Sequence, residues 1–217
     1  MDVPPMILSW SPRSPYVRFV TVVAHALGLG DRIETRYTLV NIEAPPAELM
    51  GLNPLGKIPA LELPDRVVLY DSRVICEYLD LLAGGRLLPA ESRVEQLRRQ
   101  ALGIGLIDLL IALLLERNRP EAQRAERFMD AQRMKFHTVL DSLERLAPAL
   151  TAEPFAMGHA AIGVALAYAD FRFPELPWRE ARPALARWHD HFVALPAYRA
   201  DPFFDELAAA PVAECKA

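Results

Sequence analysis

The sequence predicts a small α/β layer followed by an all-helical part. Short extended runs, which are typical of strands, occur only before residue 71, whereas apolar residues at helical spacing dominate from residue 91 onward. Two adjacent glycines, Gly84 and Gly85, separate the two regions. We therefore expect an α/β domain over residues 1–83, a linker over residues 84–90 and an all-helical domain over residues 91–217.

The order of the apolar patterns defines the α/β layer. A polar, proline-rich passage interrupts it and ends at Gly56. The expected elements are a strand at 6–10, a helix at 16–27, a strand at 33–39, a hairpin of strands at 60–63 and 67–70, and a helix from Asp71 or Ser72 to Leu82.

From residue 91 onward the sequence has almost no strand pattern, and prolines separate the helical segments. Helices are expected at 93–117, 121–146, 160–171, 181–192 and 202–207. The prolines that end or separate them are Pro120, Pro148, Pro154, Pro174, Pro177 and Pro196.

Composition excludes several classes of function. The chain has 217 residues, of which 52% are hydrophobic, enough for a substantial core. Its 28 acidic and 24 basic residues are dispersed, so we expect no nucleic-acid partner. No signal-like segment follows Met1, and the longest apolar stretch, residues 101–115, is too short for a membrane span. We expect a cytoplasmic protein without a membrane partner.

Cysteine and histidine usage predicts no metal site. Cys76 and Cys215 are far apart and outside any metal-ligand spacing, and Cys76 lies in an apolar helical pattern typical of a buried thiol. The five histidines show no metal-ligand spacing either, because His189 and His191 point to different faces of one helix.

The first candidate site feature is the loop from Ser11 to Tyr16, between the opening strand and the first helix. A hydroxyl at a helix N-terminus lies beside free N–H groups and the positive end of the helix dipole, where an anion such as a thiolate is stabilised. Ser14 is the first candidate for such a contact and Ser11 the second. Ser14 followed by Pro15 is equally typical of a simple helix cap.

The second feature is the stretch from Gly56 to Ala60. If Pro59 follows a cis bond, the backbone of Ile58 is free to pair with a peptide-like ligand as an added strand would. Lys57 lies beside it. The alternative is an ordinary edge strand with a solvated lysine.

The third feature is Asp71-Ser72 at the start of the third helix. Free N–H groups and the Ser72 hydroxyl could hold a carboxylate, while Asp71 could hold an ammonium group. Either residue could instead act only as a helix cap.

Together these stretches resemble the cytosolic glutathione S-transferase superfamily. The matching segments are SPYVR at 14–18, NPLGKIPAL at 53–61, LYDS at 69–72, AYADFRF at 167–173, PAL at 183–185 and LPAY at 195–198. The resemblance spans nearly the whole chain. It implies a thioredoxin-like N-terminal domain, an all-α C-terminal domain and a homodimer.

The resemblance also assigns roles to the candidate residues. Ser14 matches the serine of the Ser-type classes among bacterial members. Ile58-Pro59 matches the cis-proline pair that binds glutathione, with Lys57 beside it. Asp71-Ser72 matches the site for the γ-glutamyl group. Serine rather than cysteine in the loop argues against mixed-disulfide chemistry.

One departure from the family pattern concerns the core helix of the second domain. The family's Ser/Thr-x-x-Asp capping box falls on residues 156–159, which read Ala-Met-Gly-His, so the usual cap is predicted to be absent.

The resemblance implies a transferase that activates the glutathione thiol for attack on a small, partly apolar electrophile, as in detoxification. Asp108, Tyr168 and Arg172 are candidates for the pocket of the second substrate, although Asp108 could be a buried structural group. Two alternatives remain open. The chain could be a non-catalytic adaptor that binds a protein partner, or a glutathione-dependent peroxidase or dehalogenase.

Overall fold

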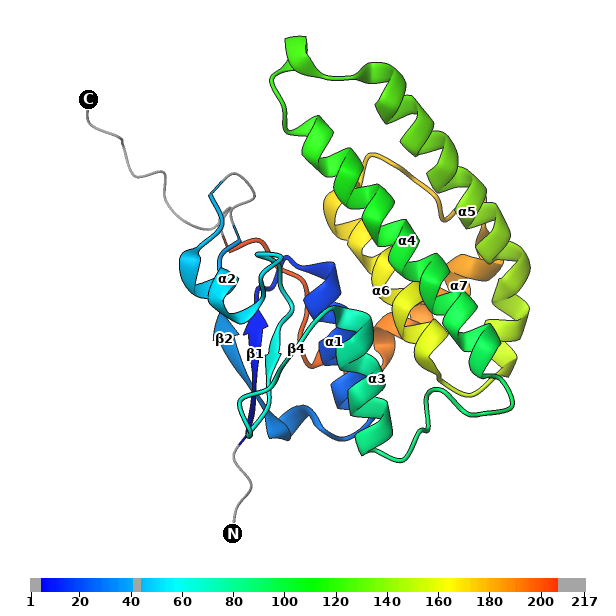
Figure 1. Ribbon diagram of the computed structural model, residues 1–217. Coiled ribbons are helices and arrows are strands. Elements are labelled where there is room, and N and C mark those ends of the chain that lie inside the picture. Colours follow the sequence, from blue (N-terminus) through cyan, green and yellow to red (C-terminus); the bar gives the residue numbers. More distant parts are fainter. Residues whose placement is uncertain (1–4, 41–43, 207–217) are drawn as a thin grey trace, which may run out of the picture.

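The computed structural model describes residues 5–40 and 44–206, which form a four-stranded sheet with helices and a helical bundle (Figure 1). The first part comprises β1 (Met6–Trp10), α1 (Pro15–Ala26), η1 (Gly30–Arg32), β2 (Ile33–Tyr37), α2 (Ala47–Leu52), β3 (Leu61–Glu62), β4 (Val68–Leu69) and α3 (Ser72–Leu82). The second comprises α4 (Arg93–Arg117), η2 (Glu121–Gln123), α5 (Glu126–Ala152), α6 (Met157–Arg172), α7 (Pro183–Ala194) and α8 (Pro196–Arg199).

The sheet has the order β2-β1-β3-β4, with β1 parallel to β2 and both other pairs antiparallel. Leu8 of β1 is fully buried and lies opposite Leu61 of β3. Helices α1 and α3 lie between the sheet and the bundle (Figure 1). The apolar faces of α1 and α3 therefore join the two parts through one continuous core.

Most predicted elements are confirmed, and four differ. The short helix α8 was not predicted from the sequence. Helix α2 was not predicted, because only Leu49 in it is buried and no amphipathic pattern marks it. Helix α5 continues through Pro148, where a break was expected, because the buried Ala147 and Leu150 hold its last turns in the core. No helix forms over residues 202–206, and Leu207 lies outside the described residues.

The segment after α8 crosses back to the α/β layer instead of forming that helix. Asp201 accepts a hydrogen bond from Trp10 Nε1 at 3.2 Å and pairs with the buried Arg18 at 3.6 Å. The guanidinium of Arg18 stacks on Tyr198, 4.4 Å from the ring centroid. These long-range contacts replace helical hydrogen bonds in this segment.

Helix α6 is the centre of the bundle, buried on every side from Met157 to Ala169. It packs closely on α4 at Gly103, where an added Cβ would lie 2.5 Å from the backbone carbon of Ala161. No side chain larger than that of glycine fits at Gly103 without separating the two helices.

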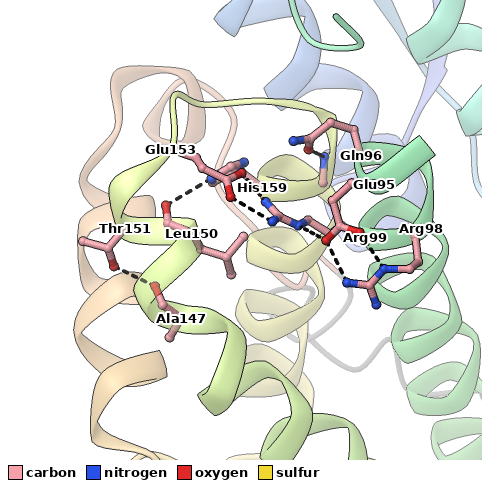
Figure 2. Close-up of polar contacts among 10 residues, drawn as sticks. Glu95, Gln96, Arg98, Arg99, Ala147, Leu150, Thr151, Glu153 and His159 are labelled. Carbon is pink, nitrogen blue, oxygen red and sulfur yellow. Dashed lines mark hydrogen bonds and ion pairs between the residues drawn. The ribbon is translucent and has the colours of Figure 1, made fainter. Parts of the chain in front are cut away.

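The predicted absence of a cap on α6 is confirmed, since Ala156 at the N-cap position makes no side-chain hydrogen bond. Neighbouring segments bind the free amides instead. The Gly158 N–H donates to Oε1 of Gln96 on α4 at 3.2 Å, and the Met157 N–H donates to the Leu87 carbonyl at 3.0 Å. Figure 2 shows Gln96 reaching the first turn of α6.

An ion-pair network next to Gln96 ties α4 to the end of α5 (Figure 2). The buried Arg99 pairs with Glu95 at 2.7 Å and with Glu153 at 2.5 Å. The hydrogen bonds from Arg98, and with them those from Arg99, lower the pKa of Glu95 to about 2. His159 bonds the Leu150 carbonyl at 3.1 Å, so the start of α6 is fixed to both neighbours.

Within residues 5–40 and 44–206, none of the helices combines the length and the apolar character that a membrane span requires.

Candidate functional site

The loop between β1 and α1 holds both candidate serines. Ser14 has extended backbone geometry at the N-cap of α1, and its Oγ accepts a hydrogen bond from the Val17 N–H at 3.3 Å. The capping role considered from the sequence is therefore present. A hydroxyl that accepts through its lone pairs keeps its own hydrogen to donate, so Ser14 can cap α1 and contact an anion at once.

Ser11 is less accessible than Ser14. Its side chain is 6% exposed, its Oγ accepts from the Arg13 N–H at 3.4 Å, and its carbonyl accepts from the Ser14 N–H at 3.2 Å. Ser14 is only half-buried. Ser11 thus shapes the turn that presents Ser14.

The second feature, before β3, has the cis Ile58–Pro59 bond that the resemblance implied. In the described part of the chain, no hydrogen bond uses the Ile58 N–H or C=O. Lys57 is exposed. A peptide-like ligand could therefore pair with the Ile58 backbone as an added strand.

Asn53 holds this loop in place, and sequence reasoning assigned it no role. It is 2% exposed, its Nδ2 donates to the Lys57 carbonyl at 2.8 Å, and its Oδ1 accepts from the Leu55 N–H at 3.0 Å. The signal was present in the sequence, because Asn53 opens the NPLGKIPAL segment.

At the third feature, Asp71 caps α3. Its Oδ1 accepts from the Arg73 N–H at 3.0 Å, and its Oδ2 pairs with the Arg73 side chain at 2.9 Å. Partial burial would raise the pKa of Asp71, but the hydrogen bonds from Arg73 outweigh it and hold the pKa below its usual value. The adjacent Ser72 is 2% exposed, and its hydroxyl makes no hydrogen bond to any described residue.

Tyr16 and Asp108 connect this region to the bundle, a contact that the sequence did not indicate. The Tyr16 hydroxyl donates to Oδ1 of Asp108 on α4. Burial and this hydrogen bond raise the pKa of Tyr16 well above its usual value, so it stays a protonated donor. Asp108 is exposed, so it is not the buried structural group considered as an alternative.

The other two candidates for the second pocket lie near the end of α6. Tyr168 is 3% exposed and packs against the ring of Phe203 at 5.7 Å between centroids. Arg172 donates to Asp205 at 2.5 Å. Tyr16 lies within electrostatic range of Tyr168, Asp108 and Asp71. The structure thus brings three candidate residues from the sequence into one region, together with Tyr16, which the sequence had not singled out.

Cys76 lies on α3, within electrostatic range of Asp71, but it does not reach the surface. The prediction of a buried Cys76 is confirmed, and burial raises the pKa of its thiol well above the usual value. Cys215 lies outside the described residues. No group of three His, Cys, Asp or Glu side chains in residues 5–40 and 44–206 could hold a metal ion. A hollow of about 250 Å³, lined by Phe155, Trp188 and others, includes none of the candidate site residues.

The fold and site define the class of protein: a thioredoxin-like α/β domain with a cis proline before β3, joined to an all-helical domain. Family models agree. The glutathione S-transferase N-terminal domain matches residues 13–82, and the glutathione S-transferase C-terminal domain matches residues 121–191. The chain belongs to the glutathione S-transferase family.

One curated relative and two solved structures illustrate the similarity. The uncharacterized GST-like protein YibF of Escherichia coli K12 is 30% identical over 189 residues, covering 84% of this chain and 91% of YibF. A glutathione transferase family member from Pseudomonas fluorescens Pf-5, solved with bound glutathione, is 36% identical with a TM-score of 0.88, covering 92% of this chain and all (100%) of that one. A second structure of a Pf-5 family member, with bound S-(propanoic acid)-glutathione, has 35% identity, covers 91% of this chain and 99% of that one, and has a TM-score of 0.83.

Proposed function

We propose that this protein is a glutathione transferase that activates the glutathione thiol through Ser14 and the N-terminus of α1 and adds it to a small, partly apolar electrophile. One observation carries the proposal. The Ser14 Oγ accepts the Val17 N–H at 3.3 Å, which fixes the hydroxyl at the positive end of α1 with its own hydrogen free to donate.

The energetics are sufficient without a metal or a general base. A thiol with a pKa of about 8.5 needs about 2.7 kcal/mol of preferential stabilisation of the thiolate to lower the pKa by two units. One charge-assisted hydrogen bond contributes roughly 1.5–3 kcal/mol and a helix terminus about 0.3–1 kcal/mol. Ser14 and the α1 N-terminus together supply this amount.

The rest of glutathione fits the other two features. In this proposal the cysteinyl backbone pairs with Ile58 before Pro59, Lys57 lies beside the same chain, and the γ-glutamyl carboxylate meets the Ser72 hydroxyl and the α3 N-terminus. Asp71, whose lowered pKa keeps it ionised, takes the ammonium group. Binding of glutathione by the Pf-5 relative, at 36% identity, supports this arrangement.

Further parts of the proposal rest on the sequence and on the family resemblance. They are a cytoplasmic homodimer with a role in detoxification, no metal cofactor, a domain division at residues 84–90, and a second-substrate pocket near Asp108, Tyr168 and Arg172. The S-substituted glutathione bound to a Pf-5 relative supports a pocket that accepts a group on the sulfur.

The test combines glutathione binding by calorimetry with conjugation of an aromatic halide. Ser14→Ala removes the proposed sulfur contact together with the side-chain cap of α1. We expect kcat/KM to fall about 10- to 150-fold, the equivalent of one charge-assisted hydrogen bond. Ser11→Ala is the matched control and is expected to lose less than Ser14→Ala. Unchanged turnover in Ser14→Ala would contradict the mechanism.

The same experiment, with a pull-down beside it, separates the alternatives. A stoichiometric protein partner together with no glutathione binding would favour a non-catalytic adaptor. Glutathione binding with no turnover of any electrophile would contradict the proposed mechanism. Turnover only of hydroperoxides or haloacids would favour a peroxidase or a dehalogenase at the same site.

A further inference from the structure

Two arginines flank the candidate site and face the C-terminal segment 200–206. Arg13 directly precedes Ser14, and Arg172 ends α6 one turn after Tyr168. Arg13 Nε donates to Glu206 Oε1 at 3.1 Å, and Arg172 Nη1 donates to Asp205 Oδ2 at 2.5 Å. Asp205 and Glu206, two consecutive acidic residues, therefore pair with the two arginines.

The two arginines belong to one place in the molecule. Burial raises the pKa of Tyr168, and the charges of Arg172 and Arg13 both oppose that rise, so both cations lie within range of the same hydroxyl. The ring of Phe203 stacks on Phe171, 5.3 Å between centroids and 7° from parallel, which holds the C-terminal segment over this spot.

Neither ion pair uses the full hydrogen-bonding capacity of its members. In the described part of the chain, Arg172 Nε is buried with no hydrogen-bond partner, and so is Glu206 Oε2. An arginine binds a carboxylate best through two parallel N–H donors. Arg13 donates to Glu206 through Nε, and the Nε donor of Arg172 is unused among the described residues. A carboxylate that also accepted from Arg172 Nε would use a donor that is otherwise left without a hydrogen bond to any described residue.

We propose that Arg13 and Arg172 form an anion subsite for the carboxylate of the second substrate, and that Asp205 and Glu206 occupy this subsite until the substrate displaces them. The inference rests on the proposed function, and it narrows the electrophile to one that bears a carboxylate. The side chains of Arg13 and Arg172 are 24% and 17% exposed, so their charges are only partly screened by solvent.

The chemistry balances with an α,β-unsaturated acid as the electrophile. The glutathione thiolate attacks the β-carbon, a C–S bond forms, the C=C π bond breaks, and the α-carbon takes a proton from water. Pairing of the carboxylate with arginine withdraws charge from the alkene and stabilises the negative charge that develops towards the carboxylate. In this reaction Ser14 stabilises the thiolate, and the two arginines bind the carboxylate of the acceptor.

Calorimetry with two glutathione adducts tests the subsite. S-(2-carboxyethyl)glutathione and S-propylglutathione have substituents of similar length on the sulfur, but only the first substituent ends in a negative charge. We expect wild-type protein to bind the carboxyethyl adduct at least about tenfold more tightly, the effect of one or two charge-assisted hydrogen bonds. Arg172→Gln should abolish the preference, and Asp205→Asn combined with Glu206→Gln should enlarge it.

The controls separate this inference from the proposed function. Arg117→Gln removes a third arginine near Tyr168, one that pairs with Glu175 instead, and it should keep the preference. Unsubstituted glutathione reports the integrity of every variant. Equal binding of both adducts by a wild type that binds glutathione would overturn the subsite alone, whereas no binding of glutathione would overturn the proposed function as well.

Discussion

Gln96 accepts the hydrogen bond that an N-cap residue of α6 would otherwise accept. It is 3% exposed, and its Oε1 lies 3.2 Å from the Gly158 N–H. Gln96→Leu keeps the side-chain volume and leaves that buried N–H unpaired, which costs about 1–3 kcal/mol. For a chain of this size, 1 kcal/mol lowers Tm by about 2–4 °C, so we expect a fall of about 2–12 °C.

A double-mutant cycle identifies the lost cap as the cause. Ala156→Ser restores a side-chain cap worth about 1 kcal/mol, and its stabilisation should be larger in the Gln96→Leu background than in wild type, because there the Gly158 N–H has no other partner. The free energy of unfolding is measured by chemical denaturation. Gln100→Leu is the control, because Gln100 is also buried on α4 and makes no hydrogen bond to any described residue.

Two results would refute this reasoning. One is a Gln96→Leu variant no less stable than Gln100→Leu. The other is an equal gain from Ala156→Ser in both backgrounds.

Three further predictions concern packing, pH and binding. Gly103→Ala should destabilise the protein by about 1–3 kcal/mol, because the added Cβ would lie 2.5 Å from the α6 backbone. Gly105→Ala, whose Cβ would have nothing within 4 Å, should be neutral or stabilising. Thermal unfolding that ranks the two variants otherwise would contradict this packing. Burial lowers the pKa of His189 well below its usual 6.5, so the stability it contributes is present above pH 6.5 and is lost as the pH falls below it. Chemical denaturation at pH 7 and pH 5 should show that His189→Gln loses less unfolding free energy between the two pH values than wild type does. His191→Gln, at an exposed position, should behave as wild type. Asp71→Asn should keep the α3 cap and thus Tm but weaken glutathione binding about tenfold or more by calorimetry; unchanged affinity would count against the ammonium contact.

Local patterns in the sequence predicted most of the fold. Helix α4 runs from Arg93 to Arg117 as expected, because its apolar periodicity and the following Asn-Arg-Pro agree. The break expected at Pro148 did not occur, since burial of the neighbouring side chains outweighs the lost hydrogen bond. The helix expected at 202–207 is absent over residues 202–206. Asp201, directly before them, binds partners more than a hundred positions away, which no local pattern encodes.

In the candidate site too, the features formed by neighbouring residues were predicted, and the contacts between distant residues were not. The loop of Ser14, the cis bond before Pro59 and the cap at Asp71 each lie within a few consecutive residues, so the sequence indicated them. The bond from Tyr16 to Asp108 joins positions 92 apart, and it follows only from how α4 packs on α1. Likewise, the missing cap at Ala156 was predicted, but its replacement lies on another helix.

The pKa of the bound glutathione thiol tests the central claim most directly. Thiolate absorbance in the ultraviolet, titrated with saturating glutathione, gives this pKa for wild type and for Ser14→Ala. We expect a thiol pKa of about 6.5 in wild type and a return towards about 8.5 in Ser14→Ala. A thiol pKa near 8.5 in wild type, or one lowered equally in Ser14→Ala, would contradict it.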